Sequence, residues 1–425
     1  MASAAPPKIV GSITPEPADE PGALVIGADY RGLTAVRSLG RHGIPVWVLV
    51  GQQSIAAKSR YALRHFAWPD GEREQLQLLL RLASEQRLRR WLLVPTDDGH
   101  AALIARHRAI LEQCFVLATS SWKALKWAYD KRLTYRLARA LKIAFPHTAC
   151  PRNRDQVANL DFPYPAILKP AFKESDNRFT RAKAWLVQNR EELLARYDDA
   201  CDLVGAKAVM IQEMIPGCGE YQFAFGALCV DGKPLASVTA RRLRQFPTSF
   251  GRSSSYVETI ENSHVECNAR RFLQALRFTG LVEVEFKQDP RDGQYKILDV
   301  NPRVWGWHTI GLQAGIDFPY LFWRLAYKKG FEEIHARSGC RWIRLATDIP
   351  AATAGIWKGI LSPRSYARGL LLPMQRAVFA ADDLLPVALE LPMLIAVWIK
   401  HLWTVRRSSR TLPSPTLDQS QGAMH

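Results

Sequence analysis

Acidic side chains alternate with apolar ones in two consecutive stretches of the chain between residues 280 and 303. Because side chains i and i+2 of a strand point to the same face, Glu283 and Glu285 share one face of the first stretch. Asp299 and Asn301 share a face of the second stretch in the same way. A turn centred on the ProArgAspGly sequence between the stretches sets Glu285 roughly across from Asp299. The pattern therefore predicts a hairpin with three or four oxygen ligands on one surface.

This predicted hairpin has the chemistry of a magnesium site. Mg²⁺ prefers oxygen ligands in octahedral geometry and usually takes one or two protein carboxylates plus water and substrate phosphates. Two facing carboxylates without a cation repel each other and raise one pKa, and a bound metal removes that cost. Arg303 adds a cation suited to a carboxylate or a phosphate. The alternation by itself also fits the solvated face of an amphipathic hairpin, but the AsnProArg and TrpGlyTrp sequences that follow suit an exposed face poorly.

Two lysines and a strand–turn segment precede the hairpin. Lys131 begins a predicted helix and Lys169 ends a predicted strand, positions from which their ammonium groups can neutralise ATP phosphates. Each lysine taken alone is most simply a solvated charge. Residues 209–223 run from a strand through a ProGly turn to a second acid. Such a strand edge can hydrogen-bond adenine and the acid can accept ribose hydroxyls, although an ordinary strand–turn–strand is the competing interpretation.

The elements that must position these residues change in character along the chain. From residue 23 to about residue 120, strands alternate with helices, which indicates a parallel sheet covered on both faces. The predicted strands here are 23–27, 44–50, 91–95 and 114–118, and the predicted helices are 32–42, 72–88 and one that ends near residue 111.

The middle of the chain reads instead as an antiparallel α+β region. A helical stretch over 121–143 breaks near Tyr129, and AspGly at 231–232 marks a hairpin turn because it tolerates positive φ. The predicted strands are 162–170, 182–187, 208–215, 221–230 and 234–246, followed by a helix over 265–278 and the acidic hairpin.

Together these features resemble the ATP-grasp superfamily, and more narrowly its carboxylate–amine ligase branch, from about residue 22 to residue 330. The resemblance implies an α/β and α+β chain, in which a Rossmann-like domain precedes an ATP-grasp fold of two α+β subdomains with ATP bound between them. The expected divisions are a flexible leader (1–21), the Rossmann-like domain (22–120), the ATP-grasp domain (121–335, with subdomains of about 121–205 and 206–335) and a C-terminal extension with an amphipathic apolar stretch and a disordered tail (336–425).

The resemblance also implies roles for single residues. The two lysines, Lys131 and Lys169, match the pair that holds the ATP phosphates. The adenine-binding linker is matched by Gln212, Glu213 and Ile215, and the ribose-binding acid by Glu220. The magnesium ligands are matched by Glu285, Asp299 and Asn301. Arg303 matches the arginine that contacts the acyl phosphate or substrate.

Two departures from the family pattern stand out. The family commonly has Glu where this chain has Asp299, which is one methylene shorter and less suited to bridging two metals. The loop that covers the phosphates is often glycine-rich, whereas residues 172–184 carry charged side chains that could replace backbone amides: Lys173, Arg178, Arg181 and Lys183.

The expected activity is an ATP-dependent ligation with Mg²⁺, or Mn²⁺ in its place. ATP phosphorylates a substrate carboxylate, and an amine then displaces the phosphate to give an amide. The substrates are expected to be a small carboxylate and a small amine, with amino acids among the candidates, and Arg242, Arg244 and His308 are candidates for binding them. The alternative is an ATP-binding regulatory or membrane-associated protein without ligase turnover.

The amino-acid composition limits the classes of partner that the protein is expected to bind. The formal charge of +17, from 57 basic and 40 acidic residues, suits acidic partners. The cations are spread out and lack an array interleaved with aromatic residues, so nucleic acid is not expected. Seven scattered cysteines without CxxC spacing indicate reduced, buried thiols and a cytoplasmic protein, and the first 21 residues lack the pattern of a secretion signal.

Two further segments invite competing interpretations. Residues 27–32 follow a strand but lack the G-x-G-x-x-G spacing of a dinucleotide site. Residues 96–100 lie at the carboxyl end of a strand, where α/β sheets bind ligands, but Asp97 or Asp98 more simply caps the next helix.

The C-terminal region carries an apolar stretch, 384–403, that is interrupted by two prolines and a glutamate. It is therefore a poor candidate for crossing a membrane. A peripheral position on an anionic inner membrane surface and docking against the core of the ligase both remain open.

Overall fold

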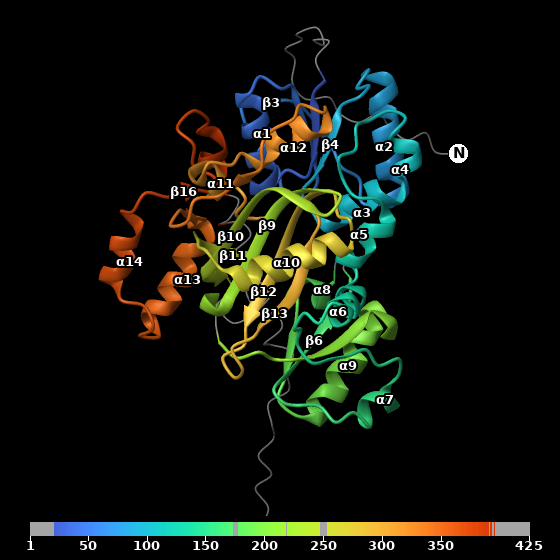
Figure 1. The fold of residues 1–425 in the computed structure, drawn as a ribbon, viewed down its shortest axis with the longest axis vertical. Coiled ribbons are helices and arrows are strands. Elements are labelled where there is room, and N and C mark those ends of the chain that lie inside the picture. The colour runs from blue at the N-terminus through green and yellow to red at the C-terminus, as the bar shows by residue number, and fades with distance from the viewer. Residues whose placement is uncertain are drawn as a thin grey trace, which may run out of the picture.

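Three sheets organise the computed structural model of the chain (Figure 1), which describes residues 21–172, 177–217, 219–246 and 253–390 together with residues 392 and 395. The predicted leader lies almost wholly outside the described residues, and so do the tail beyond residue 395 and Lys173 of the covering loop.

The N-terminal sheet is parallel, with the strand order β3-β2-β1-β4. Its strands are β1 (Ala23–Ile26), β2 (Val46–Val50), β3 (Ala62–Ala67) and β4 (Leu92–Pro95), and its helical elements are α1 (Tyr30–Arg41), η1 (Ala56–Lys58), α2 (Glu72–Glu85), α3 (Asp98–Arg106) and α4 (Arg108–Leu111). The predicted parallel sheet is confirmed. The predicted strand 114–118 is wrong, because only Val116 pairs, in one parallel bridge to Leu92.

The expected cap at the end of β4 is confirmed. Asp97 accepts a hydrogen bond from the amide of His100 at 2.9 Å and so begins α3. This satisfies one of the free N–H groups at the start of the helix.

A smaller antiparallel sheet follows, with the order β5-β8-β6-β7, and it lies at the lower end of the molecule in Figure 1. Two helices that break at Asp130 lead into it, as the sequence predicts. The elements are α5 (Trp122–Tyr129), α6 (Lys131–Ala140), β5 (Thr148–Ala149), α7 (Arg154–Ala158), β6 (Ala166–Pro170), α8 (Arg178–Ala182), β7 (Trp185–Val187), α9 (Arg190–Val204), η2 (Ala206–Ala208) and β8 (Val209–Glu213).

The largest sheet has the order β13-β12-β9-β10-β11-β15-β16, with β14 beside β10. Its strands are β9 (Gln222–Val230), β10 (Lys233–Phe246), β11 (Ser253–Thr259), β12 (Gly280–Gln288), β13 (Tyr295–Asn301), β14 (Ile334–His335), β15 (Arg341–Ile343) and β16 (Gln375–Arg376). The accompanying helical elements are η3 (Gly219–Tyr221), α10 (Ser263–Ala275), α11 (Ile310–Ala314), α12 (Phe318–Ala326), α13 (Leu345–Trp357) and α14 (Pro363–Leu370).

Both faces of this sheet are buried near its centre. Phe272 on α10 packs with Phe225 in one core, and α10 crosses the sheet in Figure 1. On the other face, Trp305 joins a core that also contains residues of β1 and α1. A side chain at Gly226 on β9 would place its Cβ 2.3 Å from the Trp305 ring, so this approach requires glycine.

Turn chemistry sets the β9–β10 hairpin as predicted. Asp231 and Gly232 have φ values of 49° and 83°, and the flanking strands pair antiparallel. Positive φ at both central residues matches the twist of a two-residue hairpin turn.

The chain beyond residue 335 continues the large sheet, since β15 pairs with β11 and β16 pairs with β15. Two acids anchor this region. Asp348 accepts two hydrogen bonds from Arg244, both at 2.8 Å. Asp383 accepts hydrogen bonds from Arg37 at 2.8 Å and from Ser59 at 2.6 Å. The domain boundaries remain predictions, and the first part of the expected extension contributes strands to the sheet.

Among the described residues, none of the helices is both long enough and apolar enough to cross a membrane. The described cysteines form no disulfide. Cys229 and Cys340 are buried, as expected, but Cys150 and Cys267 are exposed, so the expectation of buried thiols is wrong for these two.

Candidate active site

The acidic hairpin forms with the predicted register. β12 and β13 pair antiparallel, with Glu285 opposite Asp299 and Glu283 opposite Asn301. The pairing shifts immediately after Glu285. Alternation along both strands buries the intervening apolar side chains against α10 and leaves the polar ones together on the opposite face.

Lys131 lies against this polar face. It is the first residue of α6, which Asp130 caps by accepting a hydrogen bond from the amide of Arg132. The Lys131 Nζ lies 2.8 Å from Asp299 Oδ1. Burial disfavours the charged form of Asp299, but the ammonium of Lys131 outweighs this effect and holds the pKa of Asp299 below its ordinary value.

Lys169 reaches the same region from the end of β6. Its Nζ donates a hydrogen bond to Gln212 Oε1 at 3.1 Å, and Gln212 Nε2 donates to Thr148 Oγ1 at 3.0 Å. Burial, and then the positive charge of Lys131, lower the pKa of Lys169 to about 8. The structure thus brings both predicted phosphate-binding lysines close to Asp299.

Glu283 lies beside the predicted ligands and is held there by hydrogen bonds. Its carboxylate accepts hydrogen bonds from Trp307 Nε1 at 2.7 Å and from Asn301 Nδ2 at 3.0 Å. Burial, followed by the negative charge of Glu285, raises the pKa of Glu283 to about 7. The tryptophan-containing stretch after the hairpin therefore fixes the carboxylate next to the predicted ligands.

Two arginines, Arg242 and Arg303, contact the polar side chains of the hairpin. Arg242 Nη2 lies 3.5 Å from Glu285 Oε2, and its Nε donates to Ser254 Oγ at 2.9 Å. Arg303 Nη2 donates to Asn301 Oδ1 at 2.9 Å, while its Nε lies 3.2 Å from Asp98 Oδ1.

The two facing carboxylates of the site are suitable ligands for Mg²⁺. Glu285 and Asp299 face each other across the strands and are balanced by cations, as a site with one or two carboxylates and substrate phosphates requires. Within the described part of the chain, no group of three His, Cys, Asp or Glu side chains gathers as a metal site. Asn301 turns its Nδ2 rather than its oxygen toward Glu285, at 3.0 Å, so its role as a ligand stays a prediction.

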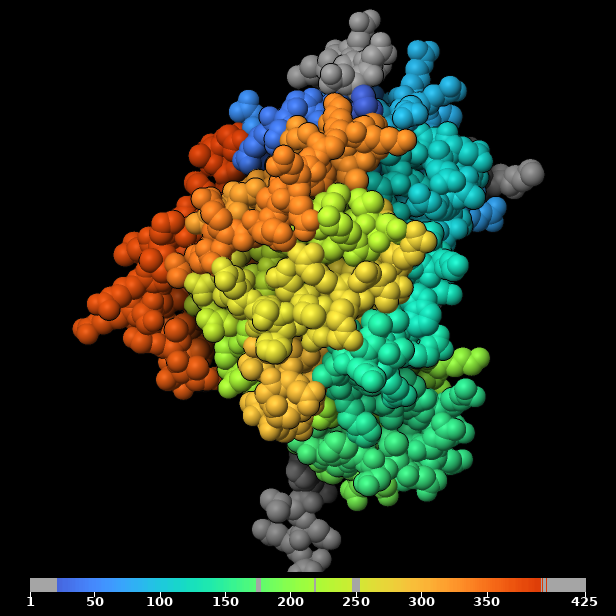
Figure 2. All heavy atoms as spheres, in the orientation of Figure 1, coloured from blue at the N-terminus to red at the C-terminus, as the bar shows by residue number. Residues whose placement is uncertain are grey.

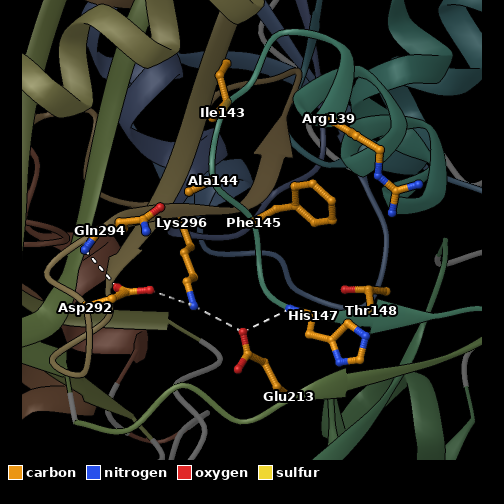
Figure 3. Close-up of a pocket in the computed structure, with 10 residues that line it drawn as sticks. All are labelled: Arg139, Ile143, Ala144, Phe145, His147, Thr148, Glu213, Asp292, Gln294 and Lys296. Carbon is orange, nitrogen blue, oxygen red and sulfur yellow. Dashed lines mark hydrogen bonds and ion pairs between the residues drawn. The ribbon is translucent and has the colours of Figure 1, made fainter. Parts of the chain in front are cut away.

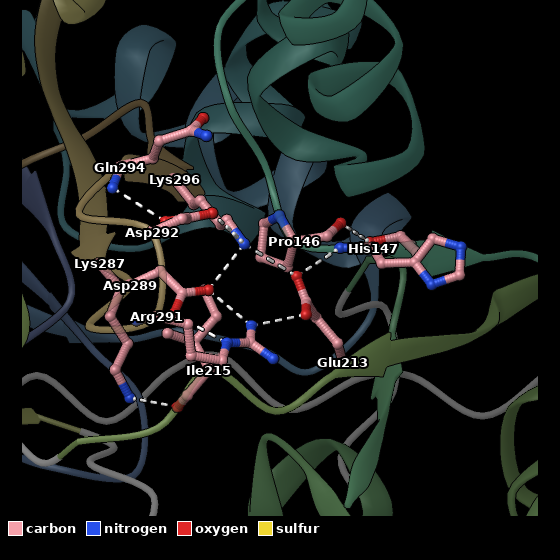
Figure 4. Close-up of polar contacts among 11 residues, drawn as sticks. Pro146, His147, Glu213, Ile215, Lys287, Asp289, Arg291, Asp292, Gln294 and Lys296 are labelled. Atoms are coloured by element: carbon pink, nitrogen blue, oxygen red, sulfur yellow. Dashed lines mark hydrogen bonds and ion pairs between the residues drawn. The ribbon is translucent and has the colours of Figure 1, made fainter. Parts of the chain in front are cut away.

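The predicted adenine linker divides between two faces of β8. Gln212 points toward Lys169, whereas the carboxylate of Glu213 lies in a separate ion-pair cluster (Figure 4). Glu213 accepts hydrogen bonds from the amide of His147 at 2.9 Å, Arg291 Nη2 at 2.7 Å and Lys296 Nζ at 3.2 Å. Any contribution of Glu213 to adenine binding would therefore come from its backbone.

Two other predicted nucleotide contacts lie just beyond this strand. The Ile215 carbonyl accepts a hydrogen bond from Lys287 Nζ at 2.8 Å, which ties the linker to β12. Glu220 lies in η3 and is exposed. Both assignments stay predictions.

A pocket of about 450 Å³ lies on the Glu213 side of the linker (Figure 3). Its walls come from the end of α6 and the chain that leads into β5, from β8, and from the hairpin tip with the start of β13. The lining residues are Arg139, Ile143, Ala144, Phe145, His147, Thr148, Glu213, Asp292, Gln294 and Lys296. Its lining includes neither the phosphate-binding lysines nor the facing carboxylates, and it adjoins them through Thr148, which accepts a hydrogen bond from Gln212, the partner of Lys169.

Two of the three candidate substrate residues have other partners. Arg244 pairs with buried Asp348, and His308 is buried between Thr34 Oγ1, at 2.9 Å, and the Trp305 carbonyl, at 2.7 Å. Arg242 alone of the three contacts the carboxylate hairpin.

In the covering loop, the described residues differ in position. Arg178 is largely exposed and lies 3.3 Å from Asp199 of α9. Lys183 follows α8 with a φ of 65°. Burial lowers its pKa, while the charges of Glu285 and Asp299 act in the opposite direction, so Lys183 interacts electrostatically with the two facing carboxylates.

Comparisons with known proteins find a related family, related sequences and similar folds. The family model described as "ATP-grasp in the biosynthetic pathway with Ter operon" matches residues 207–346. A D-aspartate ligase from Enterococcus faecium is 28% identical over 255 residues, which cover 54% of this chain and 57% of the relative. The chain thus spans little more than half the length of that relative.

Solved structures show the same architecture. The L-amino acid ligase from Bacillus licheniformis has a TM-score of 0.57 at 14% identity, covering 73% of this chain and 75% of the other. The biotin carboxylase domain of 2-oxoglutarate carboxylase from Hydrogenobacter thermophilus, a complex with MgADP and bicarbonate, has a TM-score of 0.58 at 13% identity, covering 76% of this chain and 74% of the other. The chain has an ATP-grasp fold, and the predicted fold class and resemblance are confirmed.

Proposed function

We propose that this ATP-grasp chain is a ligase that uses ATP and Mg²⁺ to join a carboxylate to an amine through an acyl phosphate. The observation that carries the proposal is the 2.8 Å contact between Lys131 and Asp299, with Glu285 directly across the hairpin. An ordinary exposed face would not hold these partly buried charges together beside a second lysine, Lys169.

The residues divide the task of holding ATP. Lys131 and Lys169 contact phosphate oxygens, since compact ammonium groups suit that role. The linker residues Gln212, Glu213 and Ile215 bind adenine, and Glu220 binds the ribose. ATP lies between the two α+β subdomains.

Glu285, Asp299 and Asn301 would hold Mg²⁺, or Mn²⁺ in its place. The metal supplies positive charge that neutralises the phosphate oxygens during transfer. Glu283 keeps Asn301 in place through its hydrogen bond, while Arg242 neutralises Glu285 from the other side.

The chemistry is a phosphoryl transfer followed by an acyl transfer. A substrate carboxylate oxygen attacks the γ-phosphorus of ATP, ADP leaves, and the acyl phosphate forms. An amine nitrogen then attacks the carbonyl carbon, phosphate leaves, and the amine loses a proton as the amide forms. Arg303 contacts the carboxylate and then the acyl phosphate, because its guanidinium is held at the end of β13 by Asn301. Positioning and electrostatics supply the rate enhancement, and no side-chain nucleophile is needed.

The substrate class is proposed to be amino acids. Its support is the pair of similar proteins named as D-aspartate and L-amino acid ligases. The test is ADP release with Mg²⁺ across a panel of D- and L-amino acids, singly and in pairs with small carboxylic acids and amines, with products identified by mass spectrometry. At least one pair is expected to give ADP and an amide in equal amounts. Tight ATP binding with no product across the panel would favour a nucleotide-binding regulator instead.

ATP binding is expected to weaken as pH rises through about 8. Lys169 has a pKa of about 8 without nucleotide, and ATP phosphates favour its charged form and so raise that pKa. Binding then takes up a proton above pH 8, and affinity falls by about tenfold between pH 7 and pH 9. Isothermal titration calorimetry in buffers of different ionisation enthalpy measures both effects. Lys169→Arg, whose guanidinium stays charged, is the control and should lose this dependence; the same slope in both proteins would assign it to another group.

A further inference from the structure

Large apolar side chains are unevenly exposed on this molecule. Among the described residues, those outside the C-terminal region are Leu63, Ile110 and Leu312. The remainder lie from residue 345 onward: Leu345, Ile349, Trp357, Ile360, Leu371, Leu372, Phe379, Leu384, Leu385 and Ile395. A concentration of exposed apolar side chains in one segment of the chain can mark an interaction site.

The packing of α13 explains why some of its apolar side chains are exposed. Asp348, Ala351 and Ala352 are buried on the face of α13 that meets β10 and β11. Leu345, Ile349 and Trp357 lie on the opposite side, within roughly a third of the circumference at about 100° per residue. The helix therefore has two apolar faces, and one of them has no partner among the described residues.

The segment after α13 extends this surface. Trp357, Ile360 and Leu371 are 86%, 79% and 85% exposed, and no residue of α14 is buried. Figure 1 places α13 and α14 at the outer edge of the large sheet, where they form the projection at the left of Figure 2. We call the exposed side chains of residues 345–376 the C-terminal surface.

The C-terminal surface is positively charged. Its exposed cations, which have no carboxylate partner among the described residues, are Lys358, Arg364, Arg368 and Arg376. The acids of this region have cationic partners. Asp348 pairs with Arg244, and beyond the surface Asp382 pairs with Arg41 and Asp383 with Arg37.

We propose that the C-terminal surface docks on an anionic lipid bilayer. Trp357, Ile360 and Leu371 enter the boundary between headgroups and acyl chains, where tryptophan is favoured. The arginines and Lys358 meet lipid phosphates. A second copy of the chain fits less well, because a self-complementary contact would bring the same unpaired cations together.

The test is co-sedimentation of the full chain with vesicles of phosphatidylcholine alone or mixed with phosphatidylglycerol. Wild type is expected to bind the anionic vesicles about tenfold or more tightly than the neutral ones, and to be released by salt. Arg364→Glu/Arg368→Glu and Trp357→Ser/Leu371→Ser should each weaken binding to anionic vesicles at least about fivefold.

Matched controls use exposed residues of the N-terminal domain. Leu63→Ser and Arg73→Glu/Arg89→Glu remove the same kinds of side chain elsewhere and should change binding less than about twofold. Thermal unfolding and ADP release in solution show that each variant is folded. The proposal is overturned if wild type does not bind anionic vesicles, or if the variants bind like wild type, which would assign binding to residues 396–425 or to overall charge. It is also overturned if the apolar variant changes only the oligomeric state in analytical ultracentrifugation, which would identify a second copy as the partner.

Discussion

Replacing Lys169 or Asp299 by alanine is expected to reduce ATP-dependent turnover by about 100- to 1,000-fold. Lys169→Ala removes a cation that neutralises the transferring phosphoryl group, so kcat should fall more than KM for ATP rises. Asp299→Ala removes one of the two facing carboxylates and also leaves the Lys131 ammonium, 2.8 Å away, without its partner. Its turnover should be the lower of the two, and its requirement for Mg²⁺ should move to higher concentration. Steady-state ADP release and calorimetric ATP binding measure these changes.

Two exposed residues of the same types serve as controls for these variants. Lys123 on α5 and Asp155 on α7 are exposed, and their alanine variants should keep turnover within about twofold of wild type because surface substitutions have small effects. Unchanged ATP affinity and turnover in both Lys169→Ala and Asp299→Ala would show that nucleotide binds elsewhere.

Replacing Asp383 by alanine is expected to lower the free energy of unfolding by about 3–5 kcal/mol. The Asp383 carboxylate is 2% exposed and accepts hydrogen bonds from Arg37, Ser59 and the amide of Arg60. Its removal leaves the buried guanidinium of Arg37 without a counter-charge. Urea denaturation followed by tryptophan fluorescence measures the loss.

The neighbouring residue provides a matched control. Asp382 also pairs with an arginine, Arg41, at 2.7 Å, but its side chain is 41% exposed. Asp382→Ala should cost only about 0–1 kcal/mol, because solvent screens exposed ion pairs. Equal losses for the two alanine variants would mean that burial does not increase the contribution of the Asp383 pair to the free energy of unfolding.

The features that could be predicted from the sequence were those with local signals. The register of the β12–β13 hairpin follows from alternation with a period of two and a ProArgAspGly turn. The β9–β10 hairpin follows from AspGly, and the break between α5 and α6 falls at Asp130, one residue beyond the expected position. The sequence indicates the boundaries of α6 and β13. In the fold these two elements place Lys131 next to Asp299.

What the sequence could not predict depends on long-range contacts. β3 is half-exposed and carries Arg64 and His65, so it lacks the apolar pattern of a buried strand. The sequence makes Arg244 a candidate for binding substrate, but in the fold it pairs with Asp348, which lies 104 residues later. The direction of the Glu213 side chain likewise depends on Arg291 and Lys296, which come from the hairpin tip.

The ion pair between Arg37 and Asp383 has a consequence for synthesis of the chain on the ribosome. The two residues are 346 positions apart, and at about 5–20 residues per second the second emerges roughly 20–70 s after the first. During that interval α1 and the strands around it carry a guanidinium whose final partner does not yet exist. The N-terminal domain can reach its finished packing only after Asp383 has been synthesised, so chains shortened before Asp383 are expected to depend on chaperones or to be degraded.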